Sequence, residues 1–375
     1  MRKLLFLLVV LVFVGCNNVV VNQSDTLKDA TKELFTFGAA LNVDQIDGKD
    51  SLAINIVKKH FNSIVAENCM KSMYMQPEEG VFFFNDADAF VQFGIENNME
   101  IIGHTLVWHS QAPDWLFVDD EGDEVTREVL IERMRNHITT IVSRYKGKIK
   151  GWDVVNEAVL DDGSLRESKF YKIIGPDFIK LAFQFAHEAD PDVELYYNDY
   201  GVSGVEKCDG IYDVVKDLID NDIRIDGVGM QGHINMDSPT VEEMEASIIK
   251  LSDLAGKVMI TELDLTVLPW PTERITAEVS LSYQLDSIYN PYPNGMPDSV
   301  SVEFNDRYAD FFRMFIKNRD RIERVTLWGV ADHHSWRNDW PIEGRRDYPL
   351  LFDDQYQAKP VVEEIIKMAN EVVLD

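Results

Sequence analysis

The sequence predicts a single-domain α/β protein in which eight parallel strands and eight helices close into a (β/α)8 barrel, the TIM-barrel architecture. Three observations predict it. Short apolar, β-branched runs alternate with amphipathic helical patterns, this alternation repeats eight times, and the length of 375 residues suits one large barrel. A doubly wound sheet is the alternative architecture, but no Gly-rich phosphate loop follows the first predicted strand.

The strands and helices are expected to take turns along the chain. Apolar, β-branched runs identify the strands, and apolar residues at helical spacing identify the helices. The predicted strands are Phe35–Leu41, Ser63–Ala66, Glu100–Val107, Ile149–Val155, Glu194–Asn198, Gly227–Gln231, Val258–Glu262 and Arg324–Trp328. The predicted helices are Ser51–His60, Ala87–Asn97, Arg127–Tyr145, Pro176–Ala189, Ile211–Asn221, Val241–Ala255, Asp306–Asn318 and Lys359–Ala369.

Two of the predicted helices carry additional support. The helix over 241–255 opens with Thr240 and Glu243, a capping-box signature that follows Pro239. The helix over 127–145 has apolar residues that fall mainly on one face, which is expected to be buried. The residues of this apolar stripe are Val129, Met134, Ile138, Ile141 and Val142.

The first residues are interpreted as a targeting segment rather than part of the fold. The basic pair Arg2-Lys3 precedes Leu4–Val14, an unbroken apolar run of signal-peptide length that is too short to span a bilayer. The run leads into Gly15-Cys16, which resembles the lipobox of bacterial lipoproteins, whose cysteine is lipidated. The expected division is a signal peptide over 1–15, a lipid-anchored tether over 16–30 and the barrel over 31–375.

This segment also predicts where the protein resides. We expect an exported outer-membrane lipoprotein, anchored at Cys16 and facing the periplasm or the cell surface. Because Phe13 stands where the lipobox usually has Leu, a plainly cleaved signal peptide and secretion are the alternative. Export permits disulfides, but Cys69 and Cys208 are far apart in a large domain and are expected to be free and buried.

The charge of the chain restricts its partners. It carries 65 acidic and 36 basic side chains, a net charge of −29 at neutral pH. Such a charge repels phosphates and anionic lipid headgroups, so no nucleic-acid partner is expected. The partner should be neutral or cationic and held by hydrogen bonds and stacking. Aromatic residues make up 11% of the chain, which fits that role, although most aromatic side chains ordinarily pack in cores.

Two acidic residues stand at the ends of predicted strands, where the chemistry of a barrel is located. The fourth strand runs into Asn156-Glu157 and the seventh ends at Glu262. A single acid in this position is well explained as the start of a helix. The pair is more informative, because its members lie 105 residues apart, or three repeats of about 35 residues. Their strands should therefore face each other across the barrel mouth.

Two opposed carboxylates are what the cleavage of a glycosidic bond requires. One must be protonated to help the leaving oxygen depart, and the other must be ionised to attack or to activate water. A separation of about 5–5.5 Å would retain the anomeric configuration through a covalent intermediate. Gln231 and His233 end the sixth strand on one face. A histidine beside Glu262 would help to keep that carboxylate charged.

Seven motifs in order resemble family 10 of the glycoside hydrolases, the endo-β-1,4-xylanases, over residues 37–359. One such motif is weak evidence, but seven in the family's order are specific. The motifs are Phe61–Lys71, Gly103–His109 with Gln111, WDVVNEA at 152–158, Asn198–Tyr200, Gly229–His233, ITELD at 260–264 and Trp328–Asp332.

The resemblance implies a retaining endo-xylanase that acts on xylan or xylo-oligosaccharides, and we expect a monomer without a cofactor. Glu157 matches the acid/base of the family and Glu262 its nucleophile. The residues expected to bind substrate are Glu67, Asn68, Lys71, His104, Trp108, Gln111, Asn156, Tyr200, Gln231, His233, Trp328 and Trp336.

Some of these residues also have simpler interpretations. A lone Lys71 would be an ordinary surface lysine, but at a strand end it is expected to reach the sugar on the non-reducing side. Spacing alone explains Trp328 and Trp336 equally well as core residues. The resemblance implies that both tryptophans cap the sugar nearest the cleavage point and that Tyr200 stacks on a sugar beyond it.

A metal site at His104 and His109 is not expected. Residues five apart on a strand face opposite ways, and no third ligand lies near them in the sequence. His104 and Trp108 are four apart and share a face, so they can line one wall together.

Two positions depart from the family pattern. Gly201 follows Asn198-Asp199-Tyr200 where the family usually has Asn, and His333-His334 stand where Gly and an aromatic or polar residue are common. They affect the expected shape of the loops rather than the reaction. The stretch 266–301, with Trp270, is expected to form a long loop that extends the product-side wall or only packs on the barrel.

Two alternative functions remain at this point. A retaining barrel enzyme could act on cellulose or mixed-linkage β-glucan, because the neighbours of Glu157 and Glu262 do not decide between xylose and glucose. A non-catalytic glycan-binding lipoprotein is the alternative of a different class, but binding alone does not need an opposed acid pair.

Overall fold

The computed structural model describes residues 24–269 and 287–373. The predicted signal peptide, Cys16 and Trp270 therefore lie outside the described residues. The strands of the described part are β1 (Thr36–Leu41), β2 (Ser63–Ala66), β3 (Glu100–Trp108), β4 (Gly151–Asn156), β5 (Glu194–Asp199), β6 (Gly227–Met230), β7 (His233–Asn235), β8 (Val258–Thr266) and β9 (Ile322–Leu327).

These strands form a closed parallel barrel. Their order is β6-β5-β4-β3-β2-β1-β9-β8-β7, and a further pairing of β6 with β8 closes the sheet. The pairings between named strands are parallel, which is possible because a helical connection returns the chain after most strands. Eight strands complete the ring, and the short β7 continues beside the far end of β8. The (β/α)8 prediction is confirmed.

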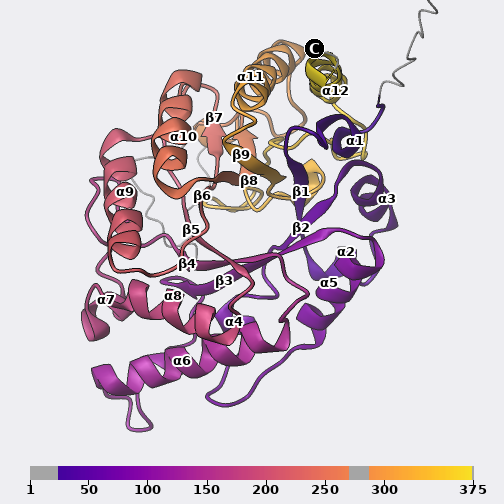
Figure 1. Cartoon of the computed structure of the whole chain (residues 1–375). Helices are drawn as coiled ribbons and strands as arrows, with labels where there is room; N and C mark the ends of the chain where they lie inside the picture. Colours follow the sequence, from indigo (N-terminus) through magenta and orange to yellow (C-terminus); the bar gives the residue numbers. More distant parts are fainter. Residues whose placement is uncertain (1–23, 270–286, 374–375) are drawn as a thin grey trace, which may run out of the picture.

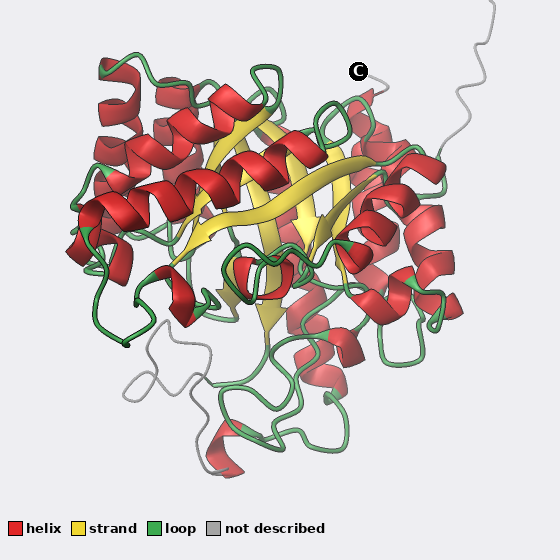
Figure 2. Cartoon of the chain, turned by 90° about the horizontal axis from the view of Figure 1, so that it is seen from below, coloured by secondary structure: helices red, strands yellow, loops and turns green. Residues whose placement is uncertain are grey.

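Helices surround the barrel (Figures 1 and 2). Those that cover it are α3 (Ser51–His60), α5 (Asn85–Glu96), α6 (Arg127–Arg144), α8 (Phe178–Ala189), α9 (Val205–Asp220), α10 (Val241–Ala255), α11 (Asp298–Lys317) and α12 (Pro360–Val373). Each corresponds to a predicted helix. Short helices that were not predicted are α1 (Leu27–Thr31), α2 (Val43–Ile46), α4 (Ser72–Met75) and α7 (Lys169–Ile174).

The folded part begins before residue 31, inside the range predicted as a tether. Thr26 caps α1 by accepting a hydrogen bond from the backbone of Asp29, and Leu27 is fully buried. The chain before α1 is held by the last helix, because Asn370 exchanges two hydrogen bonds with the backbone of Ser24. The described end of the predicted tether is therefore part of the domain.

Local details of two helices test the sequence patterns. The capping box of α10 is present, since Thr240 and Glu243 each accept a hydrogen bond from the backbone of the other. The predicted stripe of α6 is wrong at one position. Val129 is exposed and Leu130 is buried in its place, because the core-facing side of α6 continues through Met134.

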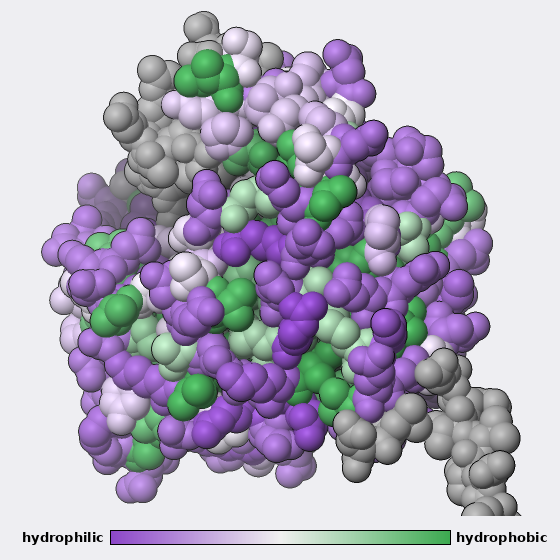
Figure 3. All heavy atoms as spheres, turned by 90° about the horizontal axis from the view of Figure 1, so that it is seen from above, coloured by the Kyte–Doolittle hydropathy of each residue, from purple (hydrophilic) through white to green (hydrophobic). Residues whose placement is uncertain are grey.

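The surface and the thiols agree with a globular, acidic domain. Figure 3 shows a face dominated by hydrophilic side chains, with apolar ones scattered among them. Cys69 and Cys208 are both free and buried, as predicted. Within the described ranges, none of the helices combines the length and the apolar character that crossing a bilayer requires.

Candidate active site

A cavity of about 820 Å³ opens at the carboxyl ends of the strands. The two predicted catalytic acids and the twelve predicted substrate-binding residues all line it. The barrel brings together residues that are almost 270 positions apart because parallel strands end at the same rim. The further lining residues are Leu160, Asp161, Arg166, Gly201, Ile234, Asn235, Thr266, Arg337 and Trp340.

Glu157 is a buried carboxylate surrounded by neutral N–H donors. Directly after β4 its backbone turns into the left-handed region, with φ of 59°, which is uncommon for a residue with a side chain. Trp108 donates its indole N–H to Oε2 at 2.9 Å, and Gln231 donates to Oε1 at 2.9 Å. The Nδ1 atom of His109 lies 3.9 Å from Oε2. These contacts fix the direction of the carboxylate.

Glu262, inside β8, is a buried carboxylate beside positive charge. Asn198 donates to its Oε1 at 2.8 Å, and His233 Nε2 lies 3.4 Å from Oε2. Burial alone would raise the pKa of this carboxyl. The hydrogen bond from His233, the charges of His104 and His233, and the bond from Asn198 outweigh burial and lower the pKa below its usual value. Glu262 is therefore held in its ionised form.

Side-chain amides connect the two carboxylates. Asn198 donates from one Nδ2 both to Glu262 and to Oδ1 of Asn156, at 2.9 Å, and Gln231 donates to Glu157. Asn198 is itself oriented, because the hydroxyl of Thr261 donates to its Oδ1 at 2.6 Å. This network fixes both acids in one rigid frame across the cavity.

A second acid on β8 stabilises the positive charge of His233. It lies 2.9 Å from Asp264 through Nδ1, and Asp264 also accepts from Trp336 at 2.7 Å and from Arg337 at 2.9 Å. Burial would lower the pKa of His233, but the charges and hydrogen bonds of Asp264 and Glu262 raise it to about 9. An imidazolium thus faces Glu262, as the sequence had led us to expect of a hydrogen-bonding histidine.

Lys71 forms part of the wall on the β2 and β3 side. Its side chain is buried, and its Nζ donates to Asn68 at 2.9 Å and lies 5.0 Å from the ring centre of Trp108. Burial lowers the pKa of Lys71, while the charges of Glu262, Glu67 and Glu157 act against that change. The ordinary surface-lysine interpretation is therefore wrong.

Aromatic side chains stand beside the acids. The ring of Trp328 lies 5.3 Å from that of His104, which is held by Asp153 at 2.9 Å. Trp336 packs against His233 at 5.0 Å and against Trp340 at 4.8 Å. Trp328 and Trp336 both line the cavity, and Trp328 is at the same time buried in a small apolar cluster against which Trp336 packs.

Tyr200 lies on the Glu157 side of the cavity. Arg166 donates to its hydroxyl at 2.9 Å and also to the backbone oxygen of Glu157 at 2.9 Å. Lys207 lies 3.1 Å from the centre of the Tyr200 ring and pairs with Asp199 at 3.0 Å. Two cations therefore hold one flat aromatic face beside the acid/base candidate.

A family model matches most of this chain. Residues 26–368 match the model of glycosyl hydrolase family 10. The chain belongs to this family.

Similar proteins agree with the family assignment. Endo-1,4-beta-xylanase A of Xylanibacter ruminicola is 50% identical over 98% of this chain and 100% of its own length. An endo-1,4-beta-xylanase of Geobacillus stearothermophilus is 41% identical over 92% and 98%. A solved family 10 endoxylanase from a sugarcane soil metagenome is 41% identical, with a TM-score of 0.86 over 92% of this chain and 99% of its own.

Three side chains that bond to residues of the site, Asp264, Arg337 and Arg166, are not identified by the sequence patterns. Asp264 lies two positions after Glu262 on the same strand, so the period of two could have placed it on the same face. Arg337 directly follows Trp336, but nothing in the sequence indicates its bond to Asp264. Arg166 lies in a loop after β4, where neither periodicity nor spacing identifies a functional side chain.

Proposed function

We propose that this chain is an endo-1,4-β-xylanase that retains the anomeric configuration, with Glu262 as nucleophile and Glu157 as acid/base. One observation carries the assignment of roles. Two buried carboxylates face one cavity, and Glu262 has a charged imidazole beside it and a pKa below its usual value. A nucleophile must be ionised, whereas an acid/base must exchange a proton during the reaction.

In the first step, Glu262 attacks the anomeric carbon and forms a glycosyl–enzyme ester. The bond to the leaving oxygen breaks, and Glu157 gives that oxygen a proton. The hydrogen bond from Asn198 and the contact with His233 orient the Glu262 carboxylate, and the carboxylate stays ionised. The indole N–H of Trp108 and the amide of Gln231 aim Glu157 from the opposite wall.

In the second step, the roles of Glu157 reverse. Now ionised, it takes a proton from a water molecule, and the resulting hydroxyl attacks the anomeric carbon while the ester bond to Glu262 breaks. Because water approaches from the face that the leaving sugar occupied, two inversions give net retention. The N–H donors around Glu157 stabilise its ionised form at this stage.

The choice of xylan over glucan rests on the similar proteins. The relatives that cover the chain end to end are named endo-1,4-beta-xylanases. The neutral hydrogen-bonding groups and the rings of Trp328, Trp336 and Tyr200 also suit an uncharged sugar chain. An acidic protein can hold such a substrate because no net charge on the ligand is needed.

Hydrolysis of several polysaccharides side by side tests the proposal. Reducing ends released from xylan, mixed-linkage β-glucan and cellulose are measured, with the Glu262→Ala variant as a control for contaminating activity. We expect release mainly from xylan, with the β-anomer appearing first by proton NMR. Equal or greater release from a glucan contradicts the substrate, and first appearance of the α-anomer contradicts the roles of the two acids.

We also propose that the protein is exported and anchored through a lipid on Cys16. The support is the apolar run Leu4–Val14 behind a basic start and the Gly15-Cys16 pair. Cell fractionation should place the protein in the membrane fraction, and Cys16→Ser should release it or leave an unprocessed precursor. A soluble unaltered protein would contradict the anchor and favour a plainly secreted form.

A monomer is the proposed assembly, because one chain provides a complete set of acids, amides and aromatic walls around the cavity. Size-exclusion chromatography with light scattering of the protein without its leader segment tests this. A dimer mass at assay concentration would contradict it.

A further inference from the structure

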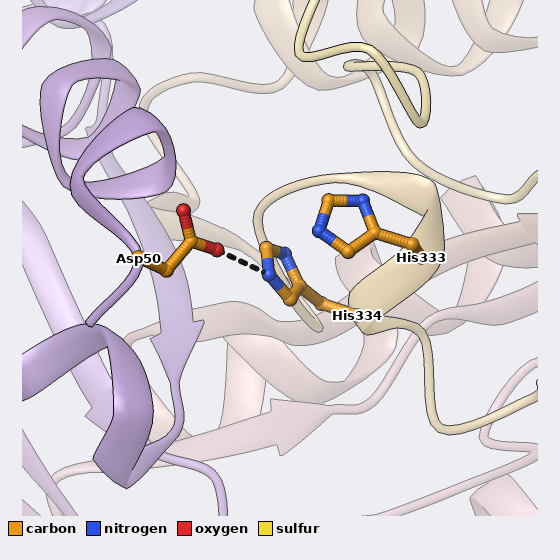
Figure 4. A group of neighbouring side chains, drawn as sticks. All are labelled: Asp50, His333 and His334. Carbon is orange, nitrogen blue, oxygen red and sulfur yellow. Dashed lines mark hydrogen bonds and ion pairs between the residues drawn. The ribbon is translucent and has the colours of Figure 1, made fainter.

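A second cluster of potential ligands lies away from the two catalytic acids. Asp50 is the N-cap of α3, and His333 and His334 belong to the single helical turn Asp332–His334 that follows β9. Each of the three residues places an imidazole nitrogen or a carboxylate oxygen within 4.8 Å of those of the other two. Figure 4 shows both imidazole rings on the same side of Asp50, with His334 bonded to its carboxylate.

The hydrogen bonds fix where the protons of this cluster are. Tyr356 donates its hydroxyl proton to Oδ2 of Asp50 at 2.7 Å, because a carboxylate can only accept. His334 Nε2 must also donate to that oxygen, at 2.7 Å. The Tyr356 oxygen then accepts from Nε2 of His333 at 2.9 Å. In the neutral form, both rings therefore carry their proton on Nε2 and a lone pair on Nδ1.

These lone pairs lack a donor. The Nδ1 atoms of His333 and His334 are both buried, and neither has a hydrogen-bond partner among the described residues. Buried polar atoms are normally satisfied, so two neighbouring exceptions require an explanation. The two rings are also unusually close, with their centres 3.9 Å apart. The cluster thus contains more electron-pair donors than protons to satisfy them.

The residue types of the cluster suit a cation. Two imidazoles, each with a lone pair on one ring nitrogen, and one carboxylate are a ligand set that zinc commonly binds.

We propose that Asp50, His333 and His334 bind a zinc ion, with the fourth position taken by water or by the Tyr356 hydroxyl. Zinc bonds to nitrogen and oxygen are about 2.0–2.2 Å long, so ligand atoms on a tetrahedral ion lie roughly 3.4 Å apart. The observed spread of up to 4.8 Å is larger, so the side chains must draw together around the ion, and an imidazole that binds through Nε2 gives up its present hydrogen bond to Asp50 or Tyr356. Either nitrogen of a histidine can serve as the ligand.

Such an ion would link two separate segments of the barrel rim. Asp50 precedes α3 in the first repeat, while the two histidines follow β9 in the last repeat. The segment that carries the histidines continues into Trp336 and Arg337, which both bond to Asp264 beside the catalytic acids. The zinc would therefore tie the active-site wall around Trp336 to the N-terminus of α3. It would be a structural ion, since its ligands lie outside the cavity lining.

Zinc titration of the full chain, after EDTA treatment and dialysis, tests the proposal by isothermal calorimetry. We expect one saturable zinc per chain and a higher melting temperature when zinc is present. His333→Ala and His334→Ala should each weaken binding by tenfold or more. Asp50→Asn should do the same while keeping the cap of α3, because Asn caps helices as well as Asp. The matched control His187→Ala, on α8, should bind like the unaltered protein.

A second readout separates binding at this site from binding elsewhere. Co²⁺ in place of zinc should give visible absorption bands that are lost in the His333→Ala and His334→Ala double variant. If a variant does not fold, as judged by circular dichroism, His333→Gln takes its place because Gln can still donate to Tyr356. Absence of a saturable zinc in the unaltered chain overturns the proposal. So does unchanged affinity in the double variant, which would place the ion elsewhere, such as on the catalytic carboxylates.

Discussion

The surroundings of Glu157 and Glu262 differ although both acids are buried at the same cavity. The two residues are similarly covered, with relative exposures of 7% and 5%. Glu157 receives hydrogen bonds from an indole and an amide, which carry no net charge. Glu262 faces His233, whose pKa is raised to about 9, and receives a bond from Asn198. Burial is therefore not what distinguishes the two carboxylates.

This difference shows that a series of alternating charges next to Glu262, rather than burial, distinguishes the proposed nucleophile. Arg337 and Asp264 form a buried pair, Asp264 holds the proton on His233, and His233 faces Glu262. The charges alternate in sign along this chain, so each member favours the ionised state of the next. The described contacts of the Glu157 carboxylate, with Trp108, Gln231 and His109, include no comparable series of alternating charges.

The largest effect is expected from Glu262→Ala, which removes the carboxylate at the end of this charge series. Without a nucleophile the first step is lost for every substrate, so activity should fall roughly 10⁵-fold or more on xylan and on aryl xylosides alike. Initial rates on both substrates measure this. A 2-fluoro xylobioside with a good leaving group should label the unaltered chain at Glu262, as mapped by peptide mass spectrometry. Label on another residue would contradict the assignment.

Glu157→Gln removes the proposed acid/base, and we expect it to affect xylan and activated aryl glycosides differently. Activity on xylan should fall about 10²–10⁴-fold, the usual contribution of general acid–base catalysis. A dinitrophenyl xylobioside should lose much less in the first step, because its leaving group needs no proton. Azide should restore turnover by attacking the glycosyl–enzyme intermediate. Equal losses on both substrates without rescue by azide would mean that Glu157 is not the acid/base.

The sequence predicted the barrel well because its signals are local. Each strand is a short apolar run and each long helix has its own apolar face, so eight repeats can be recognised without knowing their contacts. Boundaries were less predictable. The helix α9 was expected to begin at Ile211, directly after Gly210, but it begins at Val205. Gly210 is needed inside the helix because the Gly163 backbone packs where a side chain would be.

Features that depend on distant contacts were not visible in the sequence. The residues of α1 look like a polar linker, but the burial of Leu27 and Ala30 and the bonds between Ser24 and Asn370 make this segment part of the fold. The strand β7 is three residues long and was merged with the end of β6. In the site, the individual side chains were predictable from motifs, whereas the Arg337–Asp264–His233 series was not. His233 and Asp264 are 31 residues apart and Arg337 lies a further 73 residues along the chain, so the three meet only in the closed barrel.

His233→Ala tests the comparison of the two acids, because it removes the positive charge beside Glu262. The acid limb of the kcat/KM profile reports Glu262, which is active when ionised and is lost as pH falls through its pKa. Without the imidazolium, burial remains while a lowering contribution is removed, so this pKa rises and the acid limb moves to higher pH. We also expect kcat to fall roughly 10²-fold. The control His187→Ala should leave the profile unchanged, and an unshifted acid limb in His233→Ala would contradict the role of the charge series.

The smallest effect is expected at Tyr200, on the Glu157 side of the cavity. Tyr200→Ala removes the aromatic face that Lys207 and Arg166 hold in place, so the leaving part of the substrate should bind less well. Loss of one stacked sugar contact should raise KM about tenfold, which corresponds to about 1.4 kcal/mol, with little change in kcat on aryl xylosides that lack this sugar. Tyr200→Phe keeps the ring and loses only the Arg166 hydrogen bond, so its KM should stay close to that of the unaltered chain. Because Arg166 also bonds to the Glu157 backbone, the Phe variant separates stacking from positioning. A fall in kcat on aryl xylosides in Tyr200→Phe would mean that the hydroxyl acts through Arg166 on the acid/base. The position of Glu157 would then depend on a cation, as that of Glu262 does.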